Sequence, residues 1–209
     1  MKSYKDTENR IIGNLLRNPV ESKSLRKVSI DTGLSYVTVH KLVPRLLKRE
    51  LIKQKKKGKA HLVSINFEQA RIEDLTSANI AQRIVLFKRY PYIALLLGEI
   101  EDSLAGQFFI LLLFGSYAKD TATTQSDIDL LFIVPETADK ESYNDKIKKA
   151  IKLHPKIRKD FALVTTADFM QMLNQKYSVG RAAFQTGLAL FGAEQYYTMV
   201  KKYVGEKGY

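Results

Sequence analysis

The sequence contains no cysteine, and this absence excludes disulfide bonds, thiolate metal sites and cysteine nucleophiles. Glycine and proline are also few, at 11 and 5 of 209 residues, and the 45% hydrophobic and 27% charged residues are typical of a globular protein. The longest apolar run, "FFILLLF" at residues 108–114, is far too short to cross a bilayer. The charged N-terminus lacks the apolar core of a signal peptide. We therefore expect a cytoplasmic protein with no membrane partner, built as one large domain or two small ones.

Positive charge is concentrated in the first third of the chain. Residues 1–66 contain 16 Lys and Arg against 5 Asp and Glu, a net charge of +11, whereas residues 67–209 contain 18 against 17, a net charge of +1. Such an asymmetry is typical of a nucleic-acid-binding module joined to a second domain. A basic, solvated surface without a partner is the alternative that charge alone leaves open.

The pattern of residues 1–67 predicts three short helices followed by a hairpin. Residues 8–18 carry apolar side chains on one face, and a second helix is expected at Leu25–Thr32. Gly33 supplies the tight turn before a third helix, which Ser35 is suited to cap. Pro44 lies inside this third helix, where it should kink the axis. The stretch "KQKKKGKAHLVSIN" then indicates two short strands joined by a Lys-Gly turn.

This segment resembles a winged helix-turn-helix domain of the prokaryotic transcription regulators. The resemblance implies binding to double-stranded DNA, with the third helix at base edges and phosphates and the hairpin lysines at the flanking backbone. The residues expected to contact DNA are Ser35, Tyr36, Thr38, His40, Lys41, Arg45, Lys55, Lys56, Lys57 and Lys59. Domains of this kind also act as protein–protein modules, and that alternative stays open.

Residues 68–104 are expected to form a mostly helical linker, broken at Pro91. The linker is too apolar to be loose. We expect it to pack on the second domain or to form a homodimer contact, and the sequence does not choose between the two.

The stretch "LFGSYAKDTATTQSDIDLLFIV" places two aspartates inside apolar surroundings. Ionised carboxylates are rarely buried without a partner, so Asp127 and Asp129 call for a bound cation. Residues two apart on a strand point to the same face, so both carboxylates should project together. Gly115 allows a sharp turn after the first apolar run, and Ser116 then begins a short helix, expected to continue over Tyr117–Thr123. Free backbone N–H groups at that point favour a phosphate.

A third carboxylate is expected from a later strand. After a charged helix and Pro155, "RKDFALVTT" predicts a strand beginning near Asp160, which is the natural third ligand. Oxygen ligands select a hard ion such as Mg²⁺, and phosphoryl chemistry often uses two such ions.

These motifs resemble the signature of the DNA-polymerase-beta-like nucleotidyltransferase superfamily, and in particular its small "minimal" members. The resemblance covers residues 105–192. It implies that Gly115 and Ser116 bind the phosphates of a nucleoside triphosphate. It also implies that Asp127, Asp129 and Asp160 are catalytic and hold two Mg²⁺ ions, for which Mn²⁺ can substitute. Two departures from the family pattern are Asp120, where a glycine is often found, and the Arg158-Lys159 pair before Asp160.

The sequence therefore predicts an α/β (α+β) protein with a winged helix at 1–67, a helical linker at 68–104 and a nucleotidyltransferase fold with a small mixed sheet at 105–209. The expected reaction is metal-dependent transfer of a nucleoside monophosphate from an NTP to an acceptor hydroxyl. The residues do not identify the acceptor or the preferred NTP. A partner protein and an RNA are the candidate acceptors, and the resemblance adds that family members of this size act as antitoxins that modify a partner toxin. The alternative is a DNA-binding transcription regulator whose nucleotidyltransferase fold only senses a nucleotide or a partner.

Overall fold

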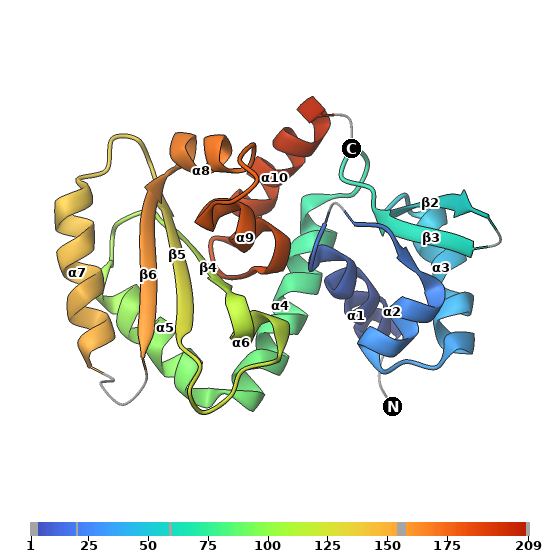
Figure 1. The fold of residues 1–209 in the computed structure, drawn as a ribbon, viewed down its shortest axis with the longest axis horizontal. Coiled ribbons are helices and arrows are strands. Elements are labelled where there is room, and N and C mark those ends of the chain that lie inside the picture. The colour runs from blue at the N-terminus through green and yellow to red at the C-terminus, as the bar shows by residue number, and fades with distance from the viewer. Residues whose placement is uncertain (1–3, 20, 59, 154–157, 208–209) are drawn as a thin grey trace. The chain divides into compact units, whose positions relative to one another are not determined.

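The computed structural model describes residues 4–19, 21–58, 60–153 and 158–207 (Figure 1). The chain divides into two compact units. Unit 1 contains Met1–Gln82 and Glu194–Tyr209, and unit 2 contains Arg83–Ala193. The units thus differ in extent from the expected segments 1–67, 68–104 and 105–209. None of the helices in the described ranges is both long and apolar enough to span a membrane.

Three helices open unit 1, as the sequence predicts: α1 (Tyr4–Leu16), α2 (Leu25–Thr32) and α3 (Tyr36–Lys48). The expected bounds of the second helix are confirmed. Gly33 ends α2 in the left-handed conformation, with φ of 63°. The Ser35 hydroxyl caps α3 by accepting a hydrogen bond from the backbone N–H of Thr38. α3 continues through Pro44 to Lys48.

A small antiparallel sheet completes this region, with strands in the order β1-β3-β2. The strands are β1 (Lys23–Ser24), β2 (Ile52–Lys57) and β3 (Ala60–Ile65), and β2 and β3 form the predicted hairpin. Ile52 is buried, whereas the rest of β2 is exposed to solvent. The lysines of β2 are therefore exposed to water.

The C-terminal helix α10 (Ala193–Lys207) packs within unit 1, against α4 (Ile72–Arg89) and the residues before it. The Tyr197 hydroxyl donates a buried hydrogen bond of 3.0 Å to Asn79 Oδ1 on α4. The Lys201 amine donates one of 2.9 Å to the Ala70 carbonyl. The last residues of the chain, expected in the second domain, thus complete the core of the first unit.

Unit 2 is built on a four-stranded mixed sheet with the order β6-β5-β4-β7 (Figure 1). β5 and β6 are parallel, and the other neighbouring strands are antiparallel. The protein is therefore α+β with a small mixed sheet, as the sequence predicts. The strands are β4 (Ile110–Phe114), β5 (Ile128–Val134), β6 (Lys159–Thr165) and β7 (Leu188–Phe191).

Helices cover both faces of this sheet, and the alternation along β5 decides which residues face which layer. Ile128, Leu130 and Phe132 share a buried apolar cluster with residues of α5 (Pro91–Ser103) and α7 (Lys140–Lys152). Asp129 lies between them in the strand and so projects to the opposite face. That face carries α6 (Gly115–Lys119), α8 (Thr166–Met172) and α9 (Val179–Thr186), which contact β5.

Candidate active site

Asp129 on β5 and Asp160 on β6 are direct neighbours across the sheet. The two residues are register partners in the parallel β5–β6 pair. Partners in a ladder point to the same face, so both carboxylates lie on the side opposite the α5–α7 cluster. Asp127 precedes β5 by one residue and stands two positions before Asp129. The structure thus brings the three predicted aspartates to one end of the sheet.

Gly115 lies against the carboxylate of Asp129. Phe114, the last residue of β4, pairs with Asp129, and Gly115 then turns with φ of 69°. A Cβ atom at position 115 would lie 1.9 Å from Asp129 Oδ2. Glycine is therefore required at position 115 for two reasons: the left-handed turn and the close approach of the backbone to the Asp129 carboxylate.

Ser116 stands in the first turn of α6, as expected, but the helix is shorter than predicted. α6 ends at Lys119 instead of continuing to Thr123, because Asp120 adopts a left-handed conformation with φ of 64°. The Asp120 carboxylate forms an ion pair with Arg89 of α4. Asp120 thus adopts a backbone conformation that favours glycine, while its charge is paired.

The electrostatics of Asp129 show that the three carboxylates interact. Burial raises the pKa of the Asp129 carboxyl, and the negative charges of Asp160 and then Asp127 raise it further, whereas Lys119 lowers it. Like charges this close disfavour one another's ionisation. A cation bound among them would relieve the repulsion.

Asp127 is held by an arginine that sequence reasoning did not assign to the site. Its Oδ1 atom is buried and accepts no hydrogen bond within the described part of the chain, although Arg158 Nε lies 2.8 Å away as an ion pair. The second arm of Arg158 donates a hydrogen bond of 2.6 Å from Nη2 to the Gln125 carbonyl. The sequence contained a signal for this contact, since Arg158 stands two residues before Asp160.

These contacts bear on the predicted metal site. Carboxylate oxygens are the donors that Mg²⁺ prefers, and the buried Asp127 Oδ1 lacks a hydrogen-bond donor, so the donor types fit a hard divalent cation. In the ranges described above, however, no three carboxylate or imidazole groups converge tightly enough to hold a metal ion. Asp127 is paired with Arg158 instead.

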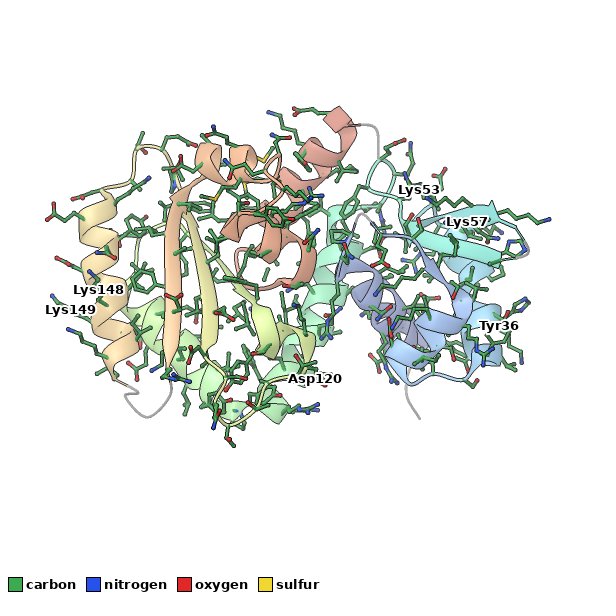
Figure 2. All side chains as sticks on the ribbon, in the orientation of Figure 1. Tyr36, Lys53, Lys57, Asp120, Lys148 and Lys149 are labelled. Atoms are coloured by element: carbon green, nitrogen blue, oxygen red, sulfur yellow. The ribbon has the colours of Figure 1, made fainter. Side chains whose placement is uncertain are left out.

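The residues predicted to contact DNA all belong to unit 1. Tyr36, His40, Lys41 and Arg45 lie on the exposed side of α3. Figure 2 shows Tyr36 on α3 and Lys57 on the hairpin as surface side chains of this unit. Ser35 and Thr38 also serve the helix itself, because their hydroxyls form the N-terminal cap, 2.8 Å apart.

Arg45 and the hairpin lysines differ in their surroundings. Arg45 Nε lies 3.7 Å from the buried carboxylate of Glu8, and its guanidinium stacks over the Tyr4 ring. Lys55, Lys56 and Lys57 are exposed on β2. Lys59, also predicted to contact DNA, lies outside the described residues.

A hollow between α3 and the hairpin adds side chains that sequence reasoning missed. It has a volume of about 320 Å³ and opens beside the outer face of α3. Its polar lining residues are Ser24, Arg26, Tyr36, His40, Gln54 and His61. The pairing of β2 with β3 brings His61 opposite Lys56, a register that the sequence alone does not fix.

Comparison with known proteins adds an independent finding for unit 2. A family model described as "Nucleotidyltransferase domain" matches residues 110–181, which is less than half of the chain. The matched range includes Gly115, Ser116 and all three aspartates. No curated protein and no solved structure matches the chain. Residues 110–181 are thus similar to nucleotidyltransferase domains, as the Gly-Ser and Asp-x-Asp motifs predict.

Proposed function

We propose that unit 2 transfers a nucleoside monophosphate from an NTP to an acceptor hydroxyl in a reaction that depends on Mg²⁺. The observation that carries this proposal is the pairing of Asp129 with Asp160 beside the Gly115 turn, inside the range that matches a nucleotidyltransferase domain. Two neighbouring carboxylates supply oxygen ligands for a cation, and the glycine turn beside them brings backbone close to one of those carboxylates.

Each residue has a role in this proposal. Ser116 binds a phosphate oxygen of the NTP, and Gly115 keeps the backbone close to Asp129. Asp129 and Asp127 hold the metal ions, and Asp160 completes the set. Mg²⁺ held by these carboxylates would neutralise charge on the triphosphate and on the pyrophosphate that leaves.

The chemical step is an in-line displacement. The acceptor oxygen forms a bond to the α-phosphorus, the bond from that phosphorus to the bridging oxygen breaks, and pyrophosphate leaves. Asp160 accepts the proton of the acceptor hydroxyl. This carboxylate is exposed at the start of β6, where an acceptor can reach it.

A second function is favoured by the ion pair between Arg158 and Asp127. If that pair persists with nucleotide present, unit 2 binds an NTP without completing its metal site, and the protein is a regulator that senses the nucleotide. The two functions predict opposite results when the protein is given a labelled substrate.

For unit 1 we propose binding to double-stranded DNA in the manner of a winged helix. The net charge of +11 over residues 1–66, the exposed polar face of α3 and the exposed lysines of β2 support this role. The acceptor of the nucleotide is a hydroxyl group of a partner protein or an RNA, as in an antitoxin that modifies its toxin. Formation of a homodimer through 68–104 stays a prediction.

The decisive experiment incubates the protein with α-³²P-labelled NTPs, Mg²⁺ and candidate protein and RNA acceptors. A transferase labels an acceptor and releases pyrophosphate, and Asp129→Asn and Asp160→Asn abolish both. Binding of NTP without transfer to any acceptor, in the wild type as in both variants, would support the sensor.

A further inference from the structure

Arg158 contacts the loop before β5 at two points and the first residue of β5 at a third. Its Nε lies 2.8 Å from Asp127 Oδ1, and its Nη2 donates a hydrogen bond of 2.6 Å to the Gln125 carbonyl. Its own carbonyl accepts a hydrogen bond of 3.0 Å from the backbone N–H of Ile128. One arginine at the start of β6 thus fixes both the backbone and the carboxylate of the segment that precedes β5.

The guanidinium contact uses an oxygen that a metal ion would need. Oδ1 of Asp127 is otherwise buried and accepts no hydrogen bond among the described residues. A cation bound to this oxygen and a guanidinium 2.8 Å from it would be like charges in contact, so one must leave. Arg158 therefore competes with a metal for Asp127.

The guanidinium is also the group that can leave at low cost. The Arg158 side chain is 72% exposed, and exposed ion pairs contribute little to stability. Two other basic residues of unit 2 are already engaged. The Lys159 amine donates a hydrogen bond of 3.0 Å to the Ile151 carbonyl, and Arg89 pairs with Asp120.

A released guanidinium would find a suitable partner in the proposed substrate. Arginine presents a planar set of donors that matches phosphate oxygens in a bidentate geometry. Arg158 stands two residues before Asp160 in the sequence, so the triphosphate of a bound NTP would come within its reach.

We propose that Arg158 is a positioning residue that exchanges one anion for another. Without nucleotide in the site, its guanidinium is paired with Asp127. When a metal–nucleoside triphosphate complex binds Asp127, the guanidinium leaves this carboxylate and binds the triphosphate. This inference rests on the proposed nucleotidyltransferase site. It gives a reason for the pairing of Asp127 with an arginine at a predicted metal site, and it assigns Arg158 to substrate binding.

The first measurement is metal affinity without nucleotide, by Mn²⁺ titration followed with electron paramagnetic resonance. Arg158→Gln should bind Mn²⁺ several-fold more tightly than the wild type, because the competing cation has been removed. Arg158→Lys keeps the competing charge and should stay close to the wild type. Lys149→Gln removes one positive charge from an exposed position on α7 and serves as the matched control, with no expected change.

The second measurement is binding of the non-transferable analogue α,β-methylene ATP in the presence of Mg²⁺. Arg158→Gln should bind it about tenfold more weakly, since a charge-assisted hydrogen bond to phosphate is lost. Arg158→Lys should lose part of this affinity, because an amine cannot make the bidentate contact. Arg158→Gln should thus bind Mn²⁺ more tightly but the analogue more weakly, whereas a general loss of folding would weaken both. Melting curves of the variants check their folding directly.

Two outcomes would overturn the inference. If Arg158→Gln binds Mn²⁺ and the analogue as the wild type does, the contact is a surface ion pair only. If it binds Mn²⁺ more weakly, Arg158 supports the metal site instead of competing for it. Asp129→Asn tests the proposed metal site separately from the role of Arg158. If this variant loses Mn²⁺ binding, the proposed function stands whatever the Arg158 variants show. If it binds Mn²⁺ as the wild type does, both the proposed function and the inference about Arg158 are rejected.

Discussion

Asp129 and Asp160 face each other across the only parallel strand pair in the described part of unit 2. Each comes from a different strand, so their distance depends on the register of β5 and β6 and not on a flexible loop. Sites built on strands hold their side chains more precisely than sites built on loops. The repulsion between the two charges is therefore a fixed property of the fold, and several measurements can detect it.

The first prediction concerns the stability of the protein without metal. The pKa of Asp129 is raised above its ordinary value of 3.8, so the folded state binds a proton more readily than the unfolded state between 3.8 and the raised value. Folding stability must then fall as the pH rises through this window and stay lower above it. Asp129→Asn has no carboxylate at this position and so avoids this loss of folding stability. The variant should therefore melt at a higher temperature than the wild type at neutral pH in EDTA.

The control for this prediction is Asp102→Asn, which removes an exposed carboxylate at the end of α5. The advantage of Asp129→Asn should shrink as the pH approaches 3.8, whereas Mg²⁺ and NTP should stabilise the wild type and not the variant. Equal melting temperatures for wild type and Asp129→Asn across the whole pH range would contradict the electrostatic picture of the site.

The second prediction compares two glycines with the same backbone conformation. Gly115 and Gly106 have φ of 69° and 76°, so alanine at either position suffers the same left-handed strain, about 1–2 kcal/mol. At 115 the new Cβ would meet Asp129 Oδ2 at 1.9 Å, whereas at 106 it meets no atom within 4 Å. Gly115→Ala should lose binding of Mg²⁺ and the ATP analogue, and Gly106→Ala should keep it. Calorimetric titration of both variants checks this, and equal affinities would place the phosphate site elsewhere.

The third prediction concerns the proposed DNA contact. Each lysine that neutralises a phosphate adds about 0.9 to the slope of log affinity against log salt concentration. Replacing Lys55, Lys56 and Lys57 by glutamine should flatten that slope by up to about 2.7 in total. The matched control replaces Lys148, Lys149 and Lys152, which are exposed on α7 of unit 2, and removes the same formal charge. The result that would argue against the hairpin as a DNA contact is an equal change of slope in the two triple variants.

The fourth prediction concerns the C-terminal helix. Asn79 is 1% exposed and Tyr197 4% exposed, and the hydrogen bond between them lies in the core of unit 1. Asn79→Ala leaves the tyrosine hydroxyl buried without this partner and should cost about 1–3 kcal/mol of stability. The chain has no tryptophan, so far-UV circular dichroism is the suitable probe of unfolding. Tyr197→Phe in the Asn79→Ala background should recover part of the loss. If Tyr197→Phe restores none of the lost stability, the Tyr197 hydroxyl is not the buried group that Asn79→Ala leaves without a partner.

Much of this architecture follows from local sequence. The bounds of α2 are set by the serine cap before it and the glycine after it, both readable in one short stretch. The strand that carries Asp160 is likewise recognisable from its apolar run. The Gly-Ser and Asp-x-Asp motifs predict where the candidate site lies, because glycine geometry and the two-residue repeat of a strand are local properties.

The features that sequence reasoning missed depend on contacts between distant residues. α6 ends early because Asp120 adopts the left-handed conformation, and its carboxylate is paired with an arginine 31 residues earlier. The contact of Asp127 with Arg158 depends on the register of two parallel strands, which no periodicity fixes. The contact of α10 with α4 includes a hydrogen bond to Asn79, a buried polar residue in a helix 118 residues earlier in the sequence.

The return of α10 to unit 1 has a consequence for how the protein is made. Unit 1 consists of two segments of chain, and the whole of unit 2 lies between them in the sequence. A ribosome delivers the second segment only after unit 2 has emerged, and domains generally fold as they are synthesised. Unit 2 can therefore fold first. Its folding brings closer together the two chain ends that lead to the segments of unit 1, so joining these segments costs less conformational entropy. The core of unit 1 that contains Asn79 and Tyr197 is then completed last, so the candidate catalytic unit can form before the basic unit is fully assembled.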